Sequence, residues 1–216
     1  MSEYFNAIAK VSKPVRWLGY LSCFSIAFIH VVPKEYLNMI VTLGVPTILI
    51  VLRTTFKDIA YTFIGIFYVV FFIMFVAFID GMPNGKILIW YVILAAWGTD
   101  IFAYFAGYLF GKHKLIPKVS PKKTIEGSIG GILGSTLVCL GFGYYFNLNL
   151  TMIILLGFFG SIIAQMGDLF ASSIKRYVGI KDYGKLIPGH GGVLDRFDSV
   201  ILVAPFVYSV INLFIQ

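Results

Sequence analysis

The sequence predicts an all-α, polytopic integral membrane protein with about seven transmembrane helices and a cytoplasmic N-terminus. Two observations support this fold class. First, 59% of the 216 residues are hydrophobic, only 12% are charged, and the mean hydropathy is +0.89, whereas soluble domains have a much more balanced composition. Second, the apolar residues form runs long enough to cross the ~30 Å of hydrocarbon in a bilayer, where the backbone must satisfy its own hydrogen bonds.

The apolar runs place the expected helices in order along the chain. The first two, Trp17–Val32 and Tyr36–Leu52, are the shortest, and Pro46 should kink the second of them. Ile59–Ile79 is the clearest span, because it contains no charge over a membrane-spanning length. The remaining four spans are expected at Ile87–Phe110, Ser128–Phe146, Leu150–Phe170 and Ser199–Ile215.

The basic residues predict the orientation of these spans. With the N-terminus inside, the N-terminal tail and segments 53–58, 111–127 and 171–198 hold 3, 2, 5 and 5 Lys and Arg residues, which is 15 of the 17. Only Lys34 and Lys86 then lie outside. This excess predicts that the four segments are cytoplasmic. The net charge of +7 therefore reflects membrane topology, and we expect no nucleic-acid partner.

The same pattern predicts a single membrane domain in the cell (inner) membrane. Residues 1–86 would form the N-terminal helices, and residues 87–216 a catalytic region with cytoplasmic loops at 111–127 and 171–198. The active site would face the cytoplasm, where the basic segments lie.

Small residues recur at intervals of four in two of the expected helices. Such residues let membrane helices approach closely, so we expect helix packing at most of these positions. At Gly111 and Gly127 an exposed backbone next to a ligand is an alternative. The residues are Ala103, Gly107, Gly111, Gly127, Gly131 and Ser135.

The most polar stretch, Ser172–Asp198, holds five basic side chains, three aspartates and one histidine beside apolar spans. Asp195 and Asp198 are three residues apart, which places them on one helix face. Two carboxylates there could hold a divalent cation. The alternative is that they cap a helix start, where an acidic side chain satisfies free amides.

A glycine-rich turn precedes these aspartates. The sequence Pro188-Gly189-His190-Gly191-Gly192 permits backbone conformations that aim amides at an anion. His190 could act as a base, as a phosphate donor or simply as a turn residue, and the pattern does not separate these roles.

Two further aspartates lie within expected spans. Asp100 is well inside the fourth span, where an ionised group is costly and indicates a functional site; the alternative is a hydrogen bond to a neighbouring helix. Asp168 ends the sixth span and shares a helix face with Ser172 and Lys175. An ion pair with Lys175 is the alternative to a catalytic role there.

The loop Lys112–Glu126 contains five lysines. It suits either anionic lipid headgroups or the phosphates of a substrate. Carboxylates, basic loops and a glycine turn on one side of a membrane together favour phosphoryl or nucleotidyl transfer, in which a metal ion and cationic side chains offset phosphate charge.

Ser172–Asp198 resembles the signature of the phosphatidate cytidylyltransferase (CDP-diacylglycerol synthase) family. Upstream, Asp100, Ser120–Thr124, Glu126-Gly127 and Gly167-Asp168 also resemble the family. The signature positions are Ser172, Lys175, Arg176, Lys181, Asp182, Gly184, Ile187, Pro188, His190, Gly191, Gly192, Asp195, Arg196 and Asp198.

The resemblance implies a reaction in which phosphatidate attacks the α-phosphorus of CTP, giving CDP-diacylglycerol and pyrophosphate. It implies Mg²⁺ or another divalent cation, leaving room for a second cation, with Asp168, Asp195 and Asp198 as ligands. Lys175, Arg176 and His190 complete the expected catalytic set. The expected substrate-binding residues are Asp100, Lys122, Lys123, Thr124, Lys181, Asp182, Gly191, Gly192 and Arg196.

The expected partners are CTP, phosphatidate and membrane lipid, and the resemblance also allows a homodimer. One alternative is a relative that uses another lipid phosphate, such as an archaeal ether lipid or a polyprenyl phosphate. A transporter is the alternative from another class, because charges within spans also mark ion pathways. A transporter predicts charges throughout the membrane depth, whereas most charges here gather at the expected cytoplasmic edge.

Overall fold

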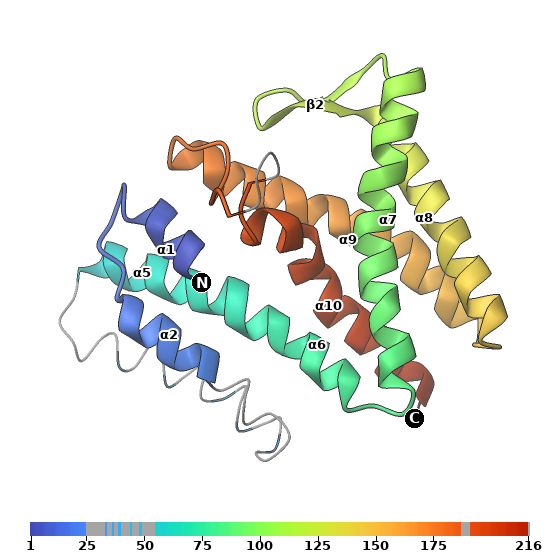
Figure 1. Ribbon diagram of the computed structural model, residues 1–216, viewed down its shortest axis with the longest axis horizontal. Coiled ribbons are helices and arrows are strands. Elements are labelled where there is room, and N and C mark those ends of the chain that lie inside the picture. Colours follow the sequence, from blue (N-terminus) through green and yellow to red (C-terminus); the bar gives the residue numbers. More distant parts are fainter. Residues whose placement is uncertain are drawn as a thin grey trace. The chain divides into compact units, whose positions relative to one another are not determined.

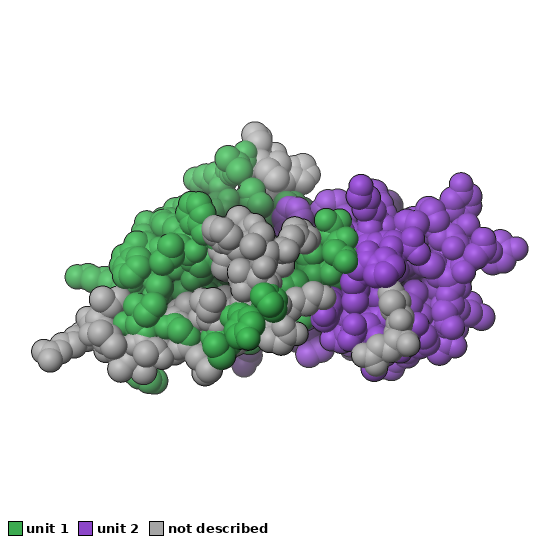
Figure 2. All heavy atoms as spheres, turned by 90° about the horizontal axis from the view of Figure 1, so that it is seen from below, with its two compact units in different colours: residues 1–81, 175–196 green, residues 82–174, 197–216 purple. Residues whose placement is uncertain are grey.

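A computed structural model describes residues 1–24, 33, 36, 39, 44, 48, 55–186 and 191–215 (Figure 1). Most of the first two expected spans, Trp17–Val32 and Tyr36–Leu52, lies outside these residues, and so does His190. The described part is mostly helical, which confirms an all-α membrane protein. Contacts divide the chain into two compact units, residues 1–81 with 175–196 and residues 82–174 with 197–216 (Figure 2). Each unit is described by itself.

The first unit contains a short N-terminal helix that the sequence did not predict. Helix α1 spans Ser2–Ile8 and α2 spans Arg16–Phe24. Tyr4 and Phe5 are 1% and 0% exposed, and the Tyr4 hydroxyl donates to the carbonyl of Tyr61 over 3.1 Å. A Cβ at Gly65 or Gly19 would lie 2.3 Å from the ring of Tyr4 or Phe5, respectively. The two glycines therefore make room for aromatic side chains that fix α1 to its neighbours.

One long helical segment, Phe56–Asp80, forms the third expected span. It consists of α5 (Phe56–Gly65), a π-helical turn η3 (Ile66–Phe71) and α6 (Phe72–Asp80). Thr55 caps its start by accepting from the amide of Asp58 over 3.3 Å. The Asp58 carboxylate in turn accepts from the hydroxyl of Ser12 and, over 2.7 Å, from the amide of Lys13. The start of α5 thus holds the chain between α1 and α2 in place.

In the second unit, α7 (Gly85–Phe110) and α8 (Ile125–Tyr145) pack along a seam of small residues (Figure 1). A Cβ at Gly127 would lie 2.8 Å from the carbonyl oxygen of Ala103, and one at Gly131 would lie 2.9 Å from that of Thr99. Ser135 adds a hydrogen bond to the carbonyl of Leu94 over 3.1 Å. The spacing of four predicted close helix packing, which the structure confirms at Gly131 and Ser135. Gly127, for which a backbone exposed to a ligand was the alternative, packs closely as well and also lines a pocket.

A two-stranded hairpin links α7 to α8 (Figure 1). Its strands, β1 (Lys114–Ile116) and β2 (Ser120–Thr124), are antiparallel. The Glu126 carboxylate ties the hairpin to the start of α8, because it accepts from the amides of Lys112 (3.0 Å) and His113 (3.2 Å) and contacts the His113 ring at 2.6 Å. The sequence predicted only a loop at these positions.

Two long helices complete the described part, α9 (Leu150–Tyr177) and α10 (Leu194–Ile215). Helix α9 extends past the expected end at Phe170, so the first residues of the expected loop 171–198 are helical. Its C-terminus is closed by hydrogen bonds from Ile180 to the carbonyl of Lys175 (2.9 Å) and from Gly179 to that of Arg176 (3.1 Å). This is a Schellman motif, and Gly179 supplies the left-handed residue with φ of 69°.

Among the described residues, five helices are long and apolar enough to cross a membrane. They correspond to the third to seventh expected spans. The protein is therefore a multi-pass membrane protein. Their bounds are Phe56–Asp80, Gly85–Phe110, Ile125–Tyr145, Leu150–Tyr177 and Leu194–Phe214.

Candidate active site

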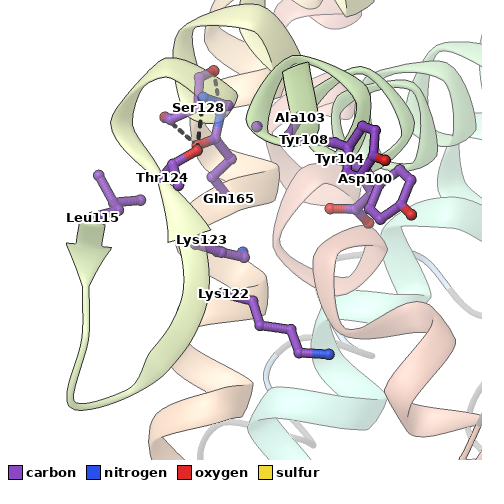
Figure 3. Close-up of a pocket in the computed structure, with 12 residues that line it drawn as sticks. Asp100, Ala103, Tyr104, Tyr108, Leu115, Lys122, Lys123, Thr124, Ser128 and Gln165 are labelled. Atoms are coloured by element: carbon purple, nitrogen blue, oxygen red, sulfur yellow. Dashed lines mark hydrogen bonds between the residues drawn. The ribbon is translucent and has the colours of Figure 1, made fainter. Parts of the chain in front are cut away.

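A pocket of about 330 Å³ lies in the second unit, with α7 on one side and the hairpin on the other (Figure 3). Asp100, Tyr104 and Tyr108 line it from successive turns of α7, and the two tyrosine rings stack with centroids 6.4 Å apart. The hairpin contributes Lys122 and Lys123. The pocket therefore joins a carboxylate and two ammonium groups with aromatic surface, which suits a small ligand that carries phosphate.

The lysines of the hairpin differ in their surroundings. Lys122 is exposed and reaches out from β2 (Figure 3). The ammonium of Lys123 instead forms an ion pair with the carboxylate of Asp168 on α9, and both side chains are partly buried. Asp168 is thus paired with a lysine 45 positions earlier in the sequence and not with Lys175, the partner that helical spacing offered.

The inner wall of the pocket is fixed by hydrogen bonds between α8 and its neighbours. Thr124 caps α8, and its hydroxyl accepts from the amide of Gly127 over 3.1 Å. Ser128 bonds through its hydroxyl to the side-chain oxygen of Gln165, whose amide nitrogen donates back to the Ser128 carbonyl over 3.2 Å. These bonds connect the hairpin, α8 and α9 at one end of the pocket.

Asp198 lies in the same unit, on α10, and is 5% exposed. The backbones of α9 and α10 approach closely beside it, because a Cβ at Gly167 would lie 3.0 Å from the carbonyl oxygen of Asp198. One oxygen of the Asp198 carboxylate accepts from the amide of Ser199 over 2.8 Å. Gly167 therefore brings the helix segment that carries Asp168 against the one that carries Asp198.

In the first unit, Lys175 and Asp195 form a buried ion pair with 2.8 Å between nitrogen and oxygen. Their side chains are 9% and 5% exposed. The other Asp195 oxygen accepts from the amides of Tyr183 (2.8 Å) and Gly192 (2.9 Å), and the Lys175 ammonium lies 5.3 Å from the centre of the Tyr183 ring. Both Asp195 oxygens already accept hydrogen bonds from protein donors, so a metal ion could bind Asp195 only by displacing one of these donors.

The glycine turn is described only at its end. Gly191 adopts a positive φ of 84°, and a Cβ there would lie 3.0 Å from a carboxylate oxygen of Asp195. Glycine is needed at this position because other residues rarely adopt that backbone conformation. The structure thus brings together Gly191, Gly192, Asp195 and Lys175, four of the residues that the sequence predicted as functional.

The remaining predicted residues are more exposed or lie elsewhere. Arg176 donates to the carbonyl of Ile180 over 3.0 Å, so it helps to close the end of α9. Lys181, Asp182 and Arg196 are exposed. His190 lies outside the described residues, so its role stays a prediction.

Metal binding also stays a prediction. Among the described residues, no three His, Cys, Asp or Glu side chains gather as a protein-only metal site would require. Carboxylate oxygens are nevertheless the ligands that Mg²⁺ prefers, and it takes one or two of them together with substrate phosphates.

The sequence did not point to three residues that the structure places at these sites. Ser128 and Gln165 line the pocket, and Tyr183 donates to Asp195 of the buried ion pair. Gln165 carried a usable signal, because an amide side chain inside a membrane span needs a partner. Tyr183 carried none, since it takes part through its backbone amide and the face of its ring.

The chain was also compared with known proteins. A model described as "Cytidylyltransferase family" matches residues 1–214. The phosphatidate cytidylyltransferases of Staphylococcus haemolyticus (strain JCSC1435) and Staphylococcus aureus (strain COL) are each 44% identical to it over 155 residues. The matched region covers 71% of this chain and 59% of each relative.

Proposed function

Because the chain belongs to the cytidylyltransferase family, we propose that it transfers CMP from CTP to phosphatidate, giving CDP-diacylglycerol and pyrophosphate in phospholipid synthesis. The similar staphylococcal proteins carry the name of this activity. The match spans 59% of their length. Their name therefore supports the proposal only together with the residues that this chain itself places at the site.

The observation that carries the proposal is the pocket between α7 and the hairpin. Its volume of about 330 Å³ is within the range of small-ligand sites. Lys122 and Lys123 offer positive charge to phosphate groups. Tyr104 and Tyr108 offer aromatic faces, to which bases bind by stacking. The pocket lies among membrane-spanning helices, which suits an enzyme with one water-soluble and one lipid substrate.

The proposed reaction is an in-line displacement at phosphorus. A phosphate oxygen of phosphatidate forms a bond to the α-phosphorus of CTP, while the bond from that phosphorus to the bridging oxygen of the β-phosphate breaks and pyrophosphate leaves. Little covalent chemistry remains for the protein, so its contribution is positioning and charge stabilisation. Lys122 and Lys123 hold phosphates, and Asp100 orients the ligand from α7.

Asp168 and Asp198 are the residues that would hold Mg²⁺. Their helices pack closely at Gly167, which precedes Asp168 and meets the backbone of Asp198, and two carboxylates leave room for substrate phosphates and water. Both Asp168 oxygens also accept from protein donors, Lys123 and Ser172, so a cation would have to displace a donor there, as at Asp195. A bound Mg²⁺ would offset negative charge on the phosphates. Lys123 forms an ion pair with Asp168. A cation bound to Asp168 would replace the Lys123 ammonium there, and that ammonium could then bind a phosphate.

The proposed location is the cell (inner) membrane with the site facing the cytoplasm. The excess of basic residues in segments 111–127 and 171–198 supports this orientation. CTP would then arrive from the cytoplasm and phosphatidate from the bilayer.

Pyrophosphate release tests the proposal. The purified chain in detergent should release pyrophosphate from CTP only when phosphatidate and Mg²⁺ are both present. Absence of release from folded protein would contradict the proposal. Competition between phosphatidate, an ether-lipid phosphate and a polyprenyl phosphate identifies the acceptor, and preference for either of the latter would replace phosphatidate in the proposed reaction.

Asp198→Asn tests the metal assignment. The substitution keeps the size of the side chain but removes its charge, so Mg²⁺-dependent turnover should be lost while the protein stays folded. Asp80→Asn, at an exposed aspartate at the end of α6, is the matched control and should retain activity. Near-normal turnover in Asp198→Asn would remove Asp198 from the metal site.

A further inference from the structure

Helix α10 begins without a capping side chain of its own. The residues before Leu194 are Gly191, Gly192 and Val193, none of which has a side-chain oxygen. The first amides of a helix have no partner within the helix, and Ser, Thr, Asp or Asn normally supplies one. In this helix the acceptor must come from another part of the chain.

Glu3 of α1 supplies that acceptor. One oxygen of its carboxylate accepts from the amide of Val193 over 3.0 Å, and the other accepts from the amide of Leu194 over 2.7 Å. Glu3 is about 190 positions away in the sequence from the two residues whose amides it accepts from. A negative charge at the N-terminus of a helix is also favoured by the helix dipole. Glu3 therefore satisfies both the hydrogen bonds and the electrostatics of the first turn of α10.

Two glycines make room for the Glu3 carboxylate. A Cβ at Gly192 would lie 2.5 Å from both of its oxygens, and a Cβ at Gly184 would lie 2.5 Å from one of them. A side chain at either position would have to push the Glu3 carboxylate aside, away from the two amides that it accepts from. Gly184 and Gly192 thus leave the room that this contact needs.

Helix α1 holds Glu3 firmly. Tyr4 and Phe5, the next two residues, are buried against Gly65 and Gly19. The Tyr4 hydroxyl is neutral at pH 7 like any phenol, burial raises its pKa further, and it donates to the carbonyl of Tyr61. Glu3 is therefore presented by a fixed element of the first unit.

The segment that Glu3 holds also carries the buried ion pair. Gly192 donates to Asp195 over 2.9 Å, and Leu194 directly precedes Asp195. A shift of the backbone at 192–194 would therefore move the Asp195 carboxylate, and with it the ammonium of Lys175.

We propose that Glu3 is a positioning residue for CMP transfer. It would act as a clamp that holds the backbone of Val193 and Leu194 at the start of α10, so that Asp195 and Lys175, both members of the predicted catalytic set, keep their places. This inference rests on the proposed function for its effect on turnover. The contact itself can be tested without any activity. Since Glu3 holds backbone and touches no substrate, its loss should lower kcat more than it raises the KM for CTP.

The experiment compares three variants of the full chain in detergent: Glu3→Ala, Glu3→Gln and the matched control Asn6→Ala, at an exposed position of the same helix. Turnover is measured below the unfolding temperature of every variant. Misplacement of a catalytic group by about 1 Å can cost about a hundredfold in rate, so kcat of Glu3→Ala should fall about tenfold to a hundredfold. Glu3→Gln, which keeps one acceptor oxygen, should fall less, and Asn6→Ala should match the wild type.

Acetate provides a sharper readout. Glu3→Ala leaves the amides of Val193 and Leu194 and the space beside Gly184 and Gly192 open to a small carboxylate. Potassium acetate should therefore restore part of the lost kcat, while potassium chloride at the same ionic strength should not. A kcat of Glu3→Ala equal to that of Asn6→Ala, or a loss of kcat that acetate does not reduce, would overturn the positioning role.

Hydrogen exchange separates this proposal from the proposed function. In Glu3→Ala the peptide containing Val193 and Leu194 should exchange faster than in Asn6→Ala, whether or not the wild type turns over CTP. Unchanged exchange would show that Glu3 does not hold these amides and would overturn the clamp. Faster exchange together with a wild type that releases no pyrophosphate would reject the proposed function and leave the clamp supported.

Discussion

Replacing Lys175 by methionine removes one charge from a buried ion pair while keeping a side chain of similar length. Lys175 and Asp195 are 9% and 5% exposed at their side chains, and their charged atoms are 2.8 Å apart. Loss of one partner leaves the other charge buried, which typically costs about 3–5 kcal/mol. Asp195 would still accept from two backbone amides, so we expect the lower end, about 3 kcal/mol.

The assay is a double-mutant cycle on unfolding in mixed micelles, followed by tryptophan fluorescence. Lys175→Met and Asp195→Asn should each lower the free energy of unfolding. The double variant should lose much less free energy of unfolding than the sum of the two single losses. Lys185→Met, at an exposed lysine in the following loop, is the control and should change little. A loss of no more than about 1 kcal/mol in Lys175→Met, as in exposed pairs, or strictly additive losses, would refute the reasoning.

Three further predictions concern the hairpin and the helix ends. Thr124→Val should lower the free energy of unfolding by about 1 kcal/mol because α8 loses its cap, whereas Thr124→Ser should retain most of it; equal stability of the two variants would contradict this. Glu126→Gln should speed hydrogen exchange at the amides of Lys112 and His113 without changing the melting temperature. Unchanged exchange would show that Glu126 does not hold these amides. Gly179→Ala should cost about 1 kcal/mol because φ is positive there, while Gly141→Ala, where a Cβ would meet nothing within 4 Å, should be tolerated.

Much of the membrane fold follows from the sequence because lipid leaves few options. An uncharged run such as Ile59–Ile79 can only be a helix across the bilayer. The spacing of Gly131 and Ser135 indicated that the helix carrying them packs closely against a neighbour, although not which neighbour. The hairpin was missed for a physical reason. Its strands are short and rich in lysine and proline, and its position depends on the carboxylate of Glu126, which lies outside both strands.

The candidate site was predicted in part. Spacing along a helix suggested that Asp168 and Lys175 share a face, but it could not show that Lys123 and Asp195 are their partners, since both come from elsewhere in the sequence. Glu3 carried no motif at all. The sequence offered no signal for this contact, because it placed the start of the last helix at Ser199 with Asp195 and Asp198 as possible caps, whereas α10 begins at Leu194. Only with that start known do Gly192 and Val193, which cannot cap a helix, indicate an acceptor from another segment.

The seam between α7 and α8 also fixes one part of the pocket wall. Gly107 and Gly127 line the pocket and face each other across the two helices. At these two positions the wall is main chain, which has no rotamers to change, so its place is set by the distance between the two helices. The rest of the lining consists of side chains, among them the exposed rings of Tyr104 and Tyr108, which can change the shape of the pocket by rotating.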